Sequence, residues 1–108
     1  MEPLADITVT APDADWLTHL THQLVEERLV ASGNVIPGVR STYRWAGRIE
    51  QADEAVVLFH TRVALVPQVI AAVEAKHPYN TPQVVALPVL AANPAYHHWV
   101  LDSTEPVA

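Results

Sequence analysis

The chain begins with a pattern of period two and then changes to a helical period. β-branched and small apolar residues alternate with threonines over 5–11, which predicts a strand. After Pro12, apolar residues recur at helical spacing on a face made of Leu17, Leu20, Leu24 and Ala31. We expect a helix over 13–31, capped by Asp13 or Asp15 and ended by Gly33.

The next stretch predicts a long hairpin of two strands, over 34–50 and 53–61. Pro37-Gly38 interrupts the first strand and indicates a bulge, and a polar run over 51–54 predicts the turn. The second strand is apolar on both faces, which is typical of the centre of a sheet. One face of the first strand is expected to carry Tyr43, Trp45 and Ile49, and the other Arg40, Thr42, Arg44, Arg48 and Glu50.

The helical period returns between Thr61 and Pro78, and a helix is expected to begin near 64, because a proline such as Pro67 fits only the first turn. A strand is expected over 83–89. Asn93-Pro94 predicts the start of a short helix that runs to about Ser103. The residues from Ser103 to Ala108 are expected to be a frayed tail.

This order of elements predicts an α+β fold of the ferredoxin-like β-α-β-β-α-β type, with an additional C-terminal helix. We expect one domain over 1–108 with its core at about 5–103. The sheet should be antiparallel and should carry both long helices on one face. The opposite face would then expose more apolar surface than a small monomer tolerates, so self-association is expected.

Composition and charge narrow the classes of partner. The chain has 108 residues, of which 50% are hydrophobic, and twelve acidic against six basic residues give a net charge of −6. This charge disfavours nucleic acid and anionic membranes as partners. The absence of cysteine excludes disulfides and thiolate metal sites, and it favours a reducing cytoplasm. The sequence shows neither a signal peptide nor an apolar run long enough to span a membrane.

Several motifs occur in order along 5–103: Val9-Thr10-Ala11-Pro12-Asp13, Asn34-Val35-Ile36-Pro37-Gly38, Tyr43-Arg44-Trp45-Ala46-Gly47-Arg48-Ile49-Glu50, His60-Thr61-Arg62, His77-Pro78-Tyr79-Asn80-Thr81-Pro82, Ala86-Leu87-Pro88 and Asn93-Pro94-Ala95-Tyr96 with Trp99. Together they resemble the CutA family of divalent-cation tolerance proteins. The resemblance implies a tight homotrimer that is similar in architecture to PII signal-transduction proteins. It also implies a role in metal tolerance, with copper or another divalent ion as a ligand.

The chain departs from that family pattern at four positions. Val9 stands where copper-binding members have cysteine, and Ser32 stands where many members have it. His77 follows Lys76, where many members have a histidine pair, and His60 replaces a common lysine. A thiolate site for soft Cu(I) is therefore missing.

The predicted ligand site combines hairpin residues with the loop after the second helix: Trp45, Arg48, His60 and Tyr79 as ligand contacts and His77 as a metal ligand. No obligate cofactor is expected, and a divalent copper or zinc ion is the candidate metal. The alternative for His77 is a structural role at the end of its helix, because one histidine does not make a metal site. The aromatic residues could equally be anchors of an interface.

Other clusters are weaker candidates. His19, His22 and Glu26 share a helical face that a metal could reach, although a solvated face is the simpler interpretation. The adjacent His97 and His98 are expected to pack at a surface or an interface. Arg40, Arg44 and Arg48 suggest either an anion site or ion pairs between subunits.

No sequence motif of an enzyme is present, so no enzymatic activity is expected. The main hypothesis is a trimer that binds a metal ion or small ligand at clefts between subunits. The alternative is a trimeric scaffold for a partner protein. Acid–base catalysis by His77 and Tyr79 is the third interpretation and ranks last.

Overall fold

The computed structural model describes residues 1–106, which form an elongated body of 47 × 27 × 22 Å. Its elements in chain order are β1 (Leu4–Ala11), α1 (Ala14–Glu26), β2 (Ser32–Trp45), β3 (Arg48–Arg62), the short 3₁₀ helix η1 (Val63–Leu65), α2 (Val66–Lys76), β4 (Val84–Pro88) and α3 (Pro94–Ser103). The predicted start of the second helix and the extent of the last one are confirmed.

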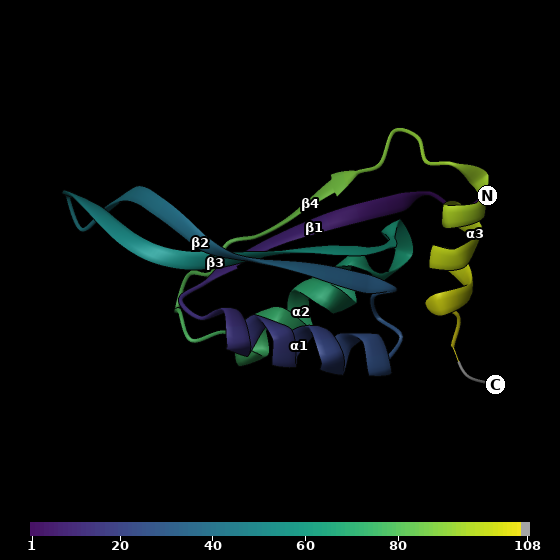
Figure 1. The fold of residues 1–108 in the computed structure, drawn as a ribbon, viewed down its shortest axis with the longest axis horizontal. Coiled ribbons are helices and arrows are strands. Elements are labelled where there is room, and N and C mark those ends of the chain that lie inside the picture. Colours follow the sequence, from purple (N-terminus) through teal and green to yellow (C-terminus); the bar gives the residue numbers. More distant parts are fainter. Residues whose placement is uncertain (107–108) are drawn as a thin grey trace.

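The four strands form one antiparallel sheet in the order β2-β3-β1-β4. Figure 1 shows α1 and α2 together beneath one face of the sheet, while α3 stands at the end opposite the tip of the β2–β3 hairpin. This arrangement confirms the predicted β-α-β-β-α-β fold. We call the face opposite α1 and α2 the open face.

The core lies between the sheet and the two long helices. Alternate residues of β1 and β3 point into it and are fully buried, as period two requires. The fully buried members include Ile7, Val9, Val57, Phe59, Leu17, Leu24, Val69 and Val73. Burial of each such side chain stabilises the fold by roughly 1.5–3 kcal/mol. The apolar stripes read from the sequence therefore account for the packing of this layer.

The predicted end of the first helix is wrong. α1 ends at Glu26, and Arg28 takes a left-handed conformation with φ of 59° that turns the chain away. Ala31 consequently leaves the helix and joins a second apolar cluster with Leu4 and Val100. Gly33 lies within β2, where a Cβ atom would come within 2.7 Å of the Thr21 Cγ2 atom. Its role is thus close packing rather than helix termination.

The position of the hairpin turn is also corrected by the structure. The turn is made by Ala46 and Gly47, whose φ values of 51° and 78° match the two positive angles of a type I′ turn. With this two-residue turn, Trp45 pairs with Arg48 and Arg44 pairs with Ile49. Directly paired residues of neighbouring strands point to the same face of the sheet. Arg48 therefore shares a face with Trp45, and Ile49 lies on the opposite face. The three arginines do not line one face as predicted.

Beyond the predicted bulge, where the register shifts between Ile36 and Val39, the hairpin continues as a two-stranded extension. We call residues 39–54 the hairpin arm. In Figure 1 the arm projects past the ends of α1 and α2. No helix covers it there, and most of its side chains are exposed.

The opposite end of the molecule is held by one buried arginine. The guanidinium of Arg62 donates to Thr104 Oγ1 (2.9 Å), Glu2 Oε2 (2.6 Å), Glu105 Oε1 (3.0 Å) and the carbonyl oxygen of Leu101. Thr104 is itself only 3% exposed. The expected frayed tail is therefore wrong for Thr104 and Glu105, while residues 107–108 lie outside the described residues.

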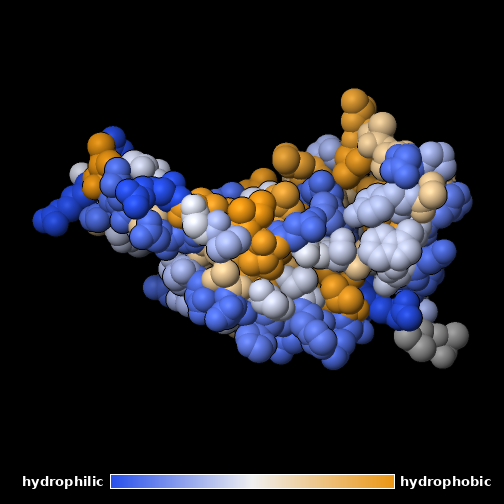
Figure 2. All heavy atoms as spheres, in the orientation of Figure 1, coloured by the Kyte–Doolittle hydropathy of each residue, from blue (hydrophilic) through white to orange (hydrophobic). Residues whose placement is uncertain are grey.

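The open face carries apolar side chains that no other part of residues 1–106 covers. Ile36, Val85 and Leu87 are about half exposed, and Leu90, in the loop between β4 and α3, is fully exposed. Figure 2 shows apolar side chains over β4 and over that loop. This surface agrees with the expectation that the face opposite the long helices is left bare.

Candidate functional site: a groove beside the hairpin arm

A groove of about 680 Å³ lies between the hairpin arm and the loop that follows α2. The arm and the end of β1 form one side, and residues 78–83 form the other. Its lining comprises Thr10, Ser41, Thr42, Tyr43, Trp45, Glu54, Pro78, Tyr79, Asn80, Thr81 and Gln83. Segments distant in sequence thus converge on one cavity with both aromatic and polar walls.

The strand register brings the arm residues to this groove. Ser41, Tyr43 and Trp45 alternate along β2 and therefore share a face, and Glu54 joins them because it pairs with Val39. Tyr43 is 44% exposed and Trp45 is 60% exposed. Neither ring belongs to the hydrophobic core, so the fold does not require their aromatic character.

His77 fixes the loop on the other side. Its Nε2–H donates to the carbonyl oxygen of Thr10 (2.8 Å), because Nδ1 accepts the backbone N–H of Tyr79 (3.0 Å). The ring is buried against Trp16, with ring centroids 5.2 Å apart. Both nitrogens are therefore used within the chain, and a metal at His77 would have to displace one of these bonds. The geometry instead makes His77 a residue that positions Tyr79.

Tyr79 reaches across the groove to the arm. Its hydroxyl donates to Glu54 Oε2 at 2.8 Å. Burial, the hydrogen bond to Glu54 and the negative charge of that carboxylate together raise the pKa of Tyr79 to about 12. At neutral pH the Tyr79 phenol consequently remains neutral, and its O–H continues to donate to the Glu54 carboxylate. An acid–base role shared by His77 and Tyr79 finds no support in this arrangement.

The electrostatic character of the groove follows from its lining. Among the described residues that form it, Glu54 is the one charged group, and none is lysine, arginine or histidine. The remaining polar groups are hydroxyls and amides, including Thr10, whose hydroxyl donates to Gln83 Oε1 at 3.0 Å. The groove therefore offers oxygen acceptors and aromatic faces, and it lacks a cationic side chain that would hold an anion.

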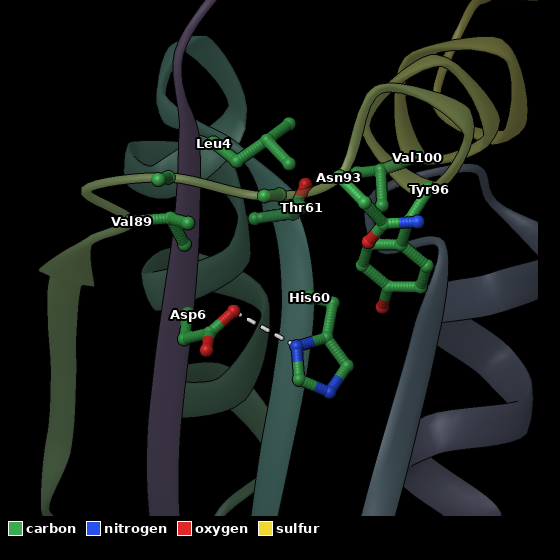
Figure 3. A pocket seen from close by; sticks show the side chains of 10 residues that line it. Leu4, Asp6, His60, Thr61, Val89, Asn93, Tyr96 and Val100 are labelled. Atoms are coloured by element: carbon green, nitrogen blue, oxygen red, sulfur yellow. Dashed lines mark hydrogen bonds and ion pairs between the residues drawn. The ribbon is translucent and has the colours of Figure 1, made fainter.

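His60 lies in a different cavity, of about 370 Å³, between the open face and α3. Its Nδ1 is 2.8 Å from Asp6 Oδ1, and its Nε2 is 2.7 Å from Asn34 Oδ1. Figure 3 shows the Asp6–His60 pair at one side of this cavity, with Tyr96 of α3 and Asn93, which precedes that helix, on the other side. Within one chain, His60 is thus separate from the groove that contains Trp45 and Tyr79.

The structure therefore divides the five predicted site residues. It brings Trp45 and Tyr79 into one groove, with Arg48 beside Trp45 across the turn but outside the lining. His77 lies buried behind Tyr79. Glu54 was missed, because the sequence placed it in a polar turn. A Gly at residue 47 beside a small residue was the signal that could have placed the turn, and hence Glu54, correctly.

The weaker candidates have simpler roles. His22 pairs with Glu26 at 2.8 Å on an exposed face, and no group of three or more potential metal ligands forms within 1–106. His97 approaches the carbonyl oxygen of Glu2 at 2.7 Å and so helps to hold the N-terminal segment. Arg40 pairs with Asp53 at 3.3 Å on the arm itself.

Comparison with known proteins places this architecture in one family. Residues 6–103 match the family described as CutA1 divalent ion tolerance protein. The chain belongs to the CutA1 family. A divalent-cation tolerance protein CutA from Thermus thermophilus is 36% identical over 91% of this chain and 95% of its own length. A mouse protein CutA is 40% identical over 93% of this chain, which spans 56% of that relative's length.

Solved structures of the CutA1 family share the complete fold. CutA1 of rice superposes with a TM-score of 0.93 at 32% identity, covering 96% of this chain and 95% of that one. CutA of Xylella fastidiosa gives 0.91 at 34% identity, covering 94% and 98%. A further structure, from Archaeoglobus fulgidus, is described as a periplasmic divalent cation tolerance protein, with 0.92 at 29% identity over 94% and 99%. In the described part of this CutA1-family chain, no helix is long and apolar enough to cross a membrane.

Proposed function

We propose that this CutA1-family chain acts in divalent-ion tolerance as a PII-like homotrimer that binds a small ligand in the groove beside the hairpin arm. Trp45 and Tyr79 contact the ligand, and Glu54 supplies the charge that orients it. Arg48 lies at the rim, next to Trp45. The groove becomes a cleft between subunits where a neighbouring copy approaches the arm.

The single observation that carries this proposal is the composition of the groove. A hollow of about 680 Å³ gathers three aromatic rings and one carboxylate that the hydrophobic core does not use. Ligand sites in proteins are concave, mostly apolar and supplied with a few convergent polar groups, and this groove has that character. His77 supports it from behind by holding the Tyr79 backbone.

The half-exposed apolar residues of the open face support association of copies. Ile36, Val85 and Leu87 leave a patch on a small chain that a second copy would cover. Because the arm extends beyond the helices, it is placed to reach such a neighbour.

A divalent ion is retained as a second ligand of the same protein, with His77 as the predicted copper or zinc ligand. Binding there requires His77 to release either Thr10 or Tyr79, so metal and the present loop conformation exclude each other. His60, which is hydrogen-bonded to Asp6, was also predicted to contact the ligand, and it lines the cavity between the open face and α3. A cytoplasmic location, which the lack of cysteine favours, completes the proposal.

Two measurements test the proposal on the intact protein. Light scattering should give three times the 11.8 kDa chain mass. Equilibrium titration with Zn(II), Cu(II) and a panel of small organic ions should give saturable binding of at least one organic ion that Tyr79→Phe and Glu54→Gln weaken. A single-chain mass, or binding that neither variant alters, would contradict the proposal.

The scaffold alternative rests on the same exposed patch. If a partner protein rather than a further copy covers Ile36, Val85 and Leu87, substitution of Leu87 by a charged residue should release that partner without changing the chain's own mass. Under this alternative, the wild-type protein should show no binding in the ligand titrations.

A further inference from the structure

We propose that the groove recognises a small organic ammonium ion, of the size of a trimethylammonium group. This inference depends on the groove being a ligand site, as proposed above, and it adds the chemical class of the ligand. It is carried by the combination of aromatic faces, one carboxylate and the absence of a lining cation among the described residues.

The aromatic side chains supply the attraction. Tyr43 and Trp45 approach from the arm and Tyr79 from the loop, so the rings border the hollow from two sides. The face of an aromatic ring is electron-rich and attracts a cation that lies over it, most strongly for tryptophan. Because the Tyr79 hydroxyl donates to Glu54, its ring also gains electron density. A group with several methyls on a positive nitrogen can contact more than one such face at once.

The carboxylate of Glu54 supplies the charge. It accepts one hydrogen bond, from Tyr79, and a carboxylate has acceptor positions for more. It is partly buried, where an ion pair is screened less than at an open surface. The net charge of −6 adds a general attraction for cations.

Other ligand classes fit the groove less well. An anion would face Glu54 with no cation in the lining, and Arg48 lies across the turn rather than in the hollow. A hard divalent ion would find oxygen donors but a single carboxylate. A soft ion would need imidazole or sulfur, and the nearest imidazole, His77, is engaged at both nitrogens. A weakly hydrated organic cation needs neither a second carboxylate nor a preformed ligand shell.

Calorimetric titration of the intact protein provides the test, with choline as the probe. The matched control ligand is its neutral carbon isostere, in which a tert-butyl group replaces the trimethylammonium group. We expect choline to bind at least about tenfold more tightly than the isostere, because the two differ in charge and hardly in shape. Equal affinity for the two ligands, or no heat with choline, would overturn the inference.

Two variants locate the binding. Trp45→Leu and Glu54→Gln should each weaken choline by about fivefold or more, since each removes one of the proposed attractions. Trp99→Leu is the matched control, because Trp99 is 46% exposed and belongs to α3, at the end of the molecule opposite the tip of the hairpin arm. This variant should leave the affinity unchanged. Choline binding that Trp45→Leu does not alter would also overturn the inference.

The outcome separates this inference from the function on which it rests. If choline fails but another ion of the panel binds in a manner that Tyr79→Phe weakens, the groove remains the ligand site and only the ammonium class is wrong. If no probe binds, the proposed ligand-binding function and the inferred ligand class are both wrong. If phosphate binds and Arg48→Ala abolishes it, the site is an anion site at the arm tip.

Discussion

The two ends of this molecule use polar and aromatic side chains in opposite ways. At the α3 end, Arg62 is buried and donates to four different residues. Its guanidinium therefore joins the two terminal segments to the sheet. At the arm end, Tyr43 and Trp45 are exposed, and Glu54 meets a single partner. Buried polar groups whose hydrogen bonds are all formed within the chain stabilise the fold. The aromatic rings and the carboxylate of the arm are instead left accessible to a ligand.

Substitution of Arg62 is expected to have the largest effect on the free energy of unfolding. Arg62→Met should lower it by about 2–3 kcal/mol, because Thr104 and the Leu101 carbonyl lose their donor while the half-exposed Glu2 and Glu105 can rehydrate. Urea denaturation at fixed protein concentration measures the change. Arg40→Met, in an exposed pair on the arm, should cost less than about 0.5 kcal/mol. An equal loss of unfolding free energy in Arg62→Met and Arg40→Met would contradict the difference between the two ends of the molecule.

Substitution of His77 tests whether the loop side of the groove is structural. His77→Ala should lower the free energy of unfolding by about 2 kcal/mol, because Thr10 and Tyr79 lose a buried partner. The exposed His98→Ala serves as the control and should be nearly neutral. Unchanged stability of His77→Ala together with loss of Zn(II) or Cu(II) binding would show that His77 is a metal ligand instead.

A change in the turn weakens the arm alone. Gly47 has φ of 78°, which a β-branched residue adopts only under strain, so Gly47→Val should cost about 1–2 kcal/mol. Hydrogen exchange should rise in 39–54 and remain unchanged in β1 and α1. Ala46→Gly is the control without strain, since glycine accepts φ of 51° with no steric clash. Faster exchange throughout the core after Gly47→Val would mean that the arm is not a separate region.

The smallest effect concerns alkaline pH. Because the folded-state pKa of Tyr79 is raised from 10 to about 12, its neutral form stabilises the fold below pH 10, and that contribution is lost as pH rises towards 12. Tyr79→Phe should therefore flatten the fall in stability across this window. Phenolate absorbance of wild type minus Tyr79→Phe should show a titration near pH 12. A difference titration at pH 10 would contradict the Tyr79–Glu54 contact.

The sequence predicted the order of the elements from their burial pattern, although it extended the first helix to the buried Ala31. The period-two strands and the helical stripes gave the order of elements, because half-buried elements must repeat their apolar positions with their own period. It misplaced the hairpin turn because the arm has no core on either side, so no burial pattern marks its register. The positive φ of Ala46 and Gly47 decided that register instead.

The candidate site shows the same limit. Trp45 and Tyr79 were predicted from their motifs, and the structure brings them together in the groove. Glu54 was missed because the register error left it in a turn. The satisfied state of His77 depends on the Thr10 carbonyl, sixty-seven residues away in the chain, which no local pattern reveals.

The most direct test of the account follows the three tryptophan indole N–H signals in an NMR spectrum while choline is added. Trp45 lies in the proposed site, Trp16 packs against His77, and Trp99 lies on α3. Each signal is assigned by its loss in the corresponding Trp→Phe variant. The account predicts that the Trp45 signal moves and saturates while those of Trp16 and Trp99 stay in place. A stationary Trp45 signal, with movement only at Trp16 when Zn(II) replaces choline, would contradict it and place the ligand at His77.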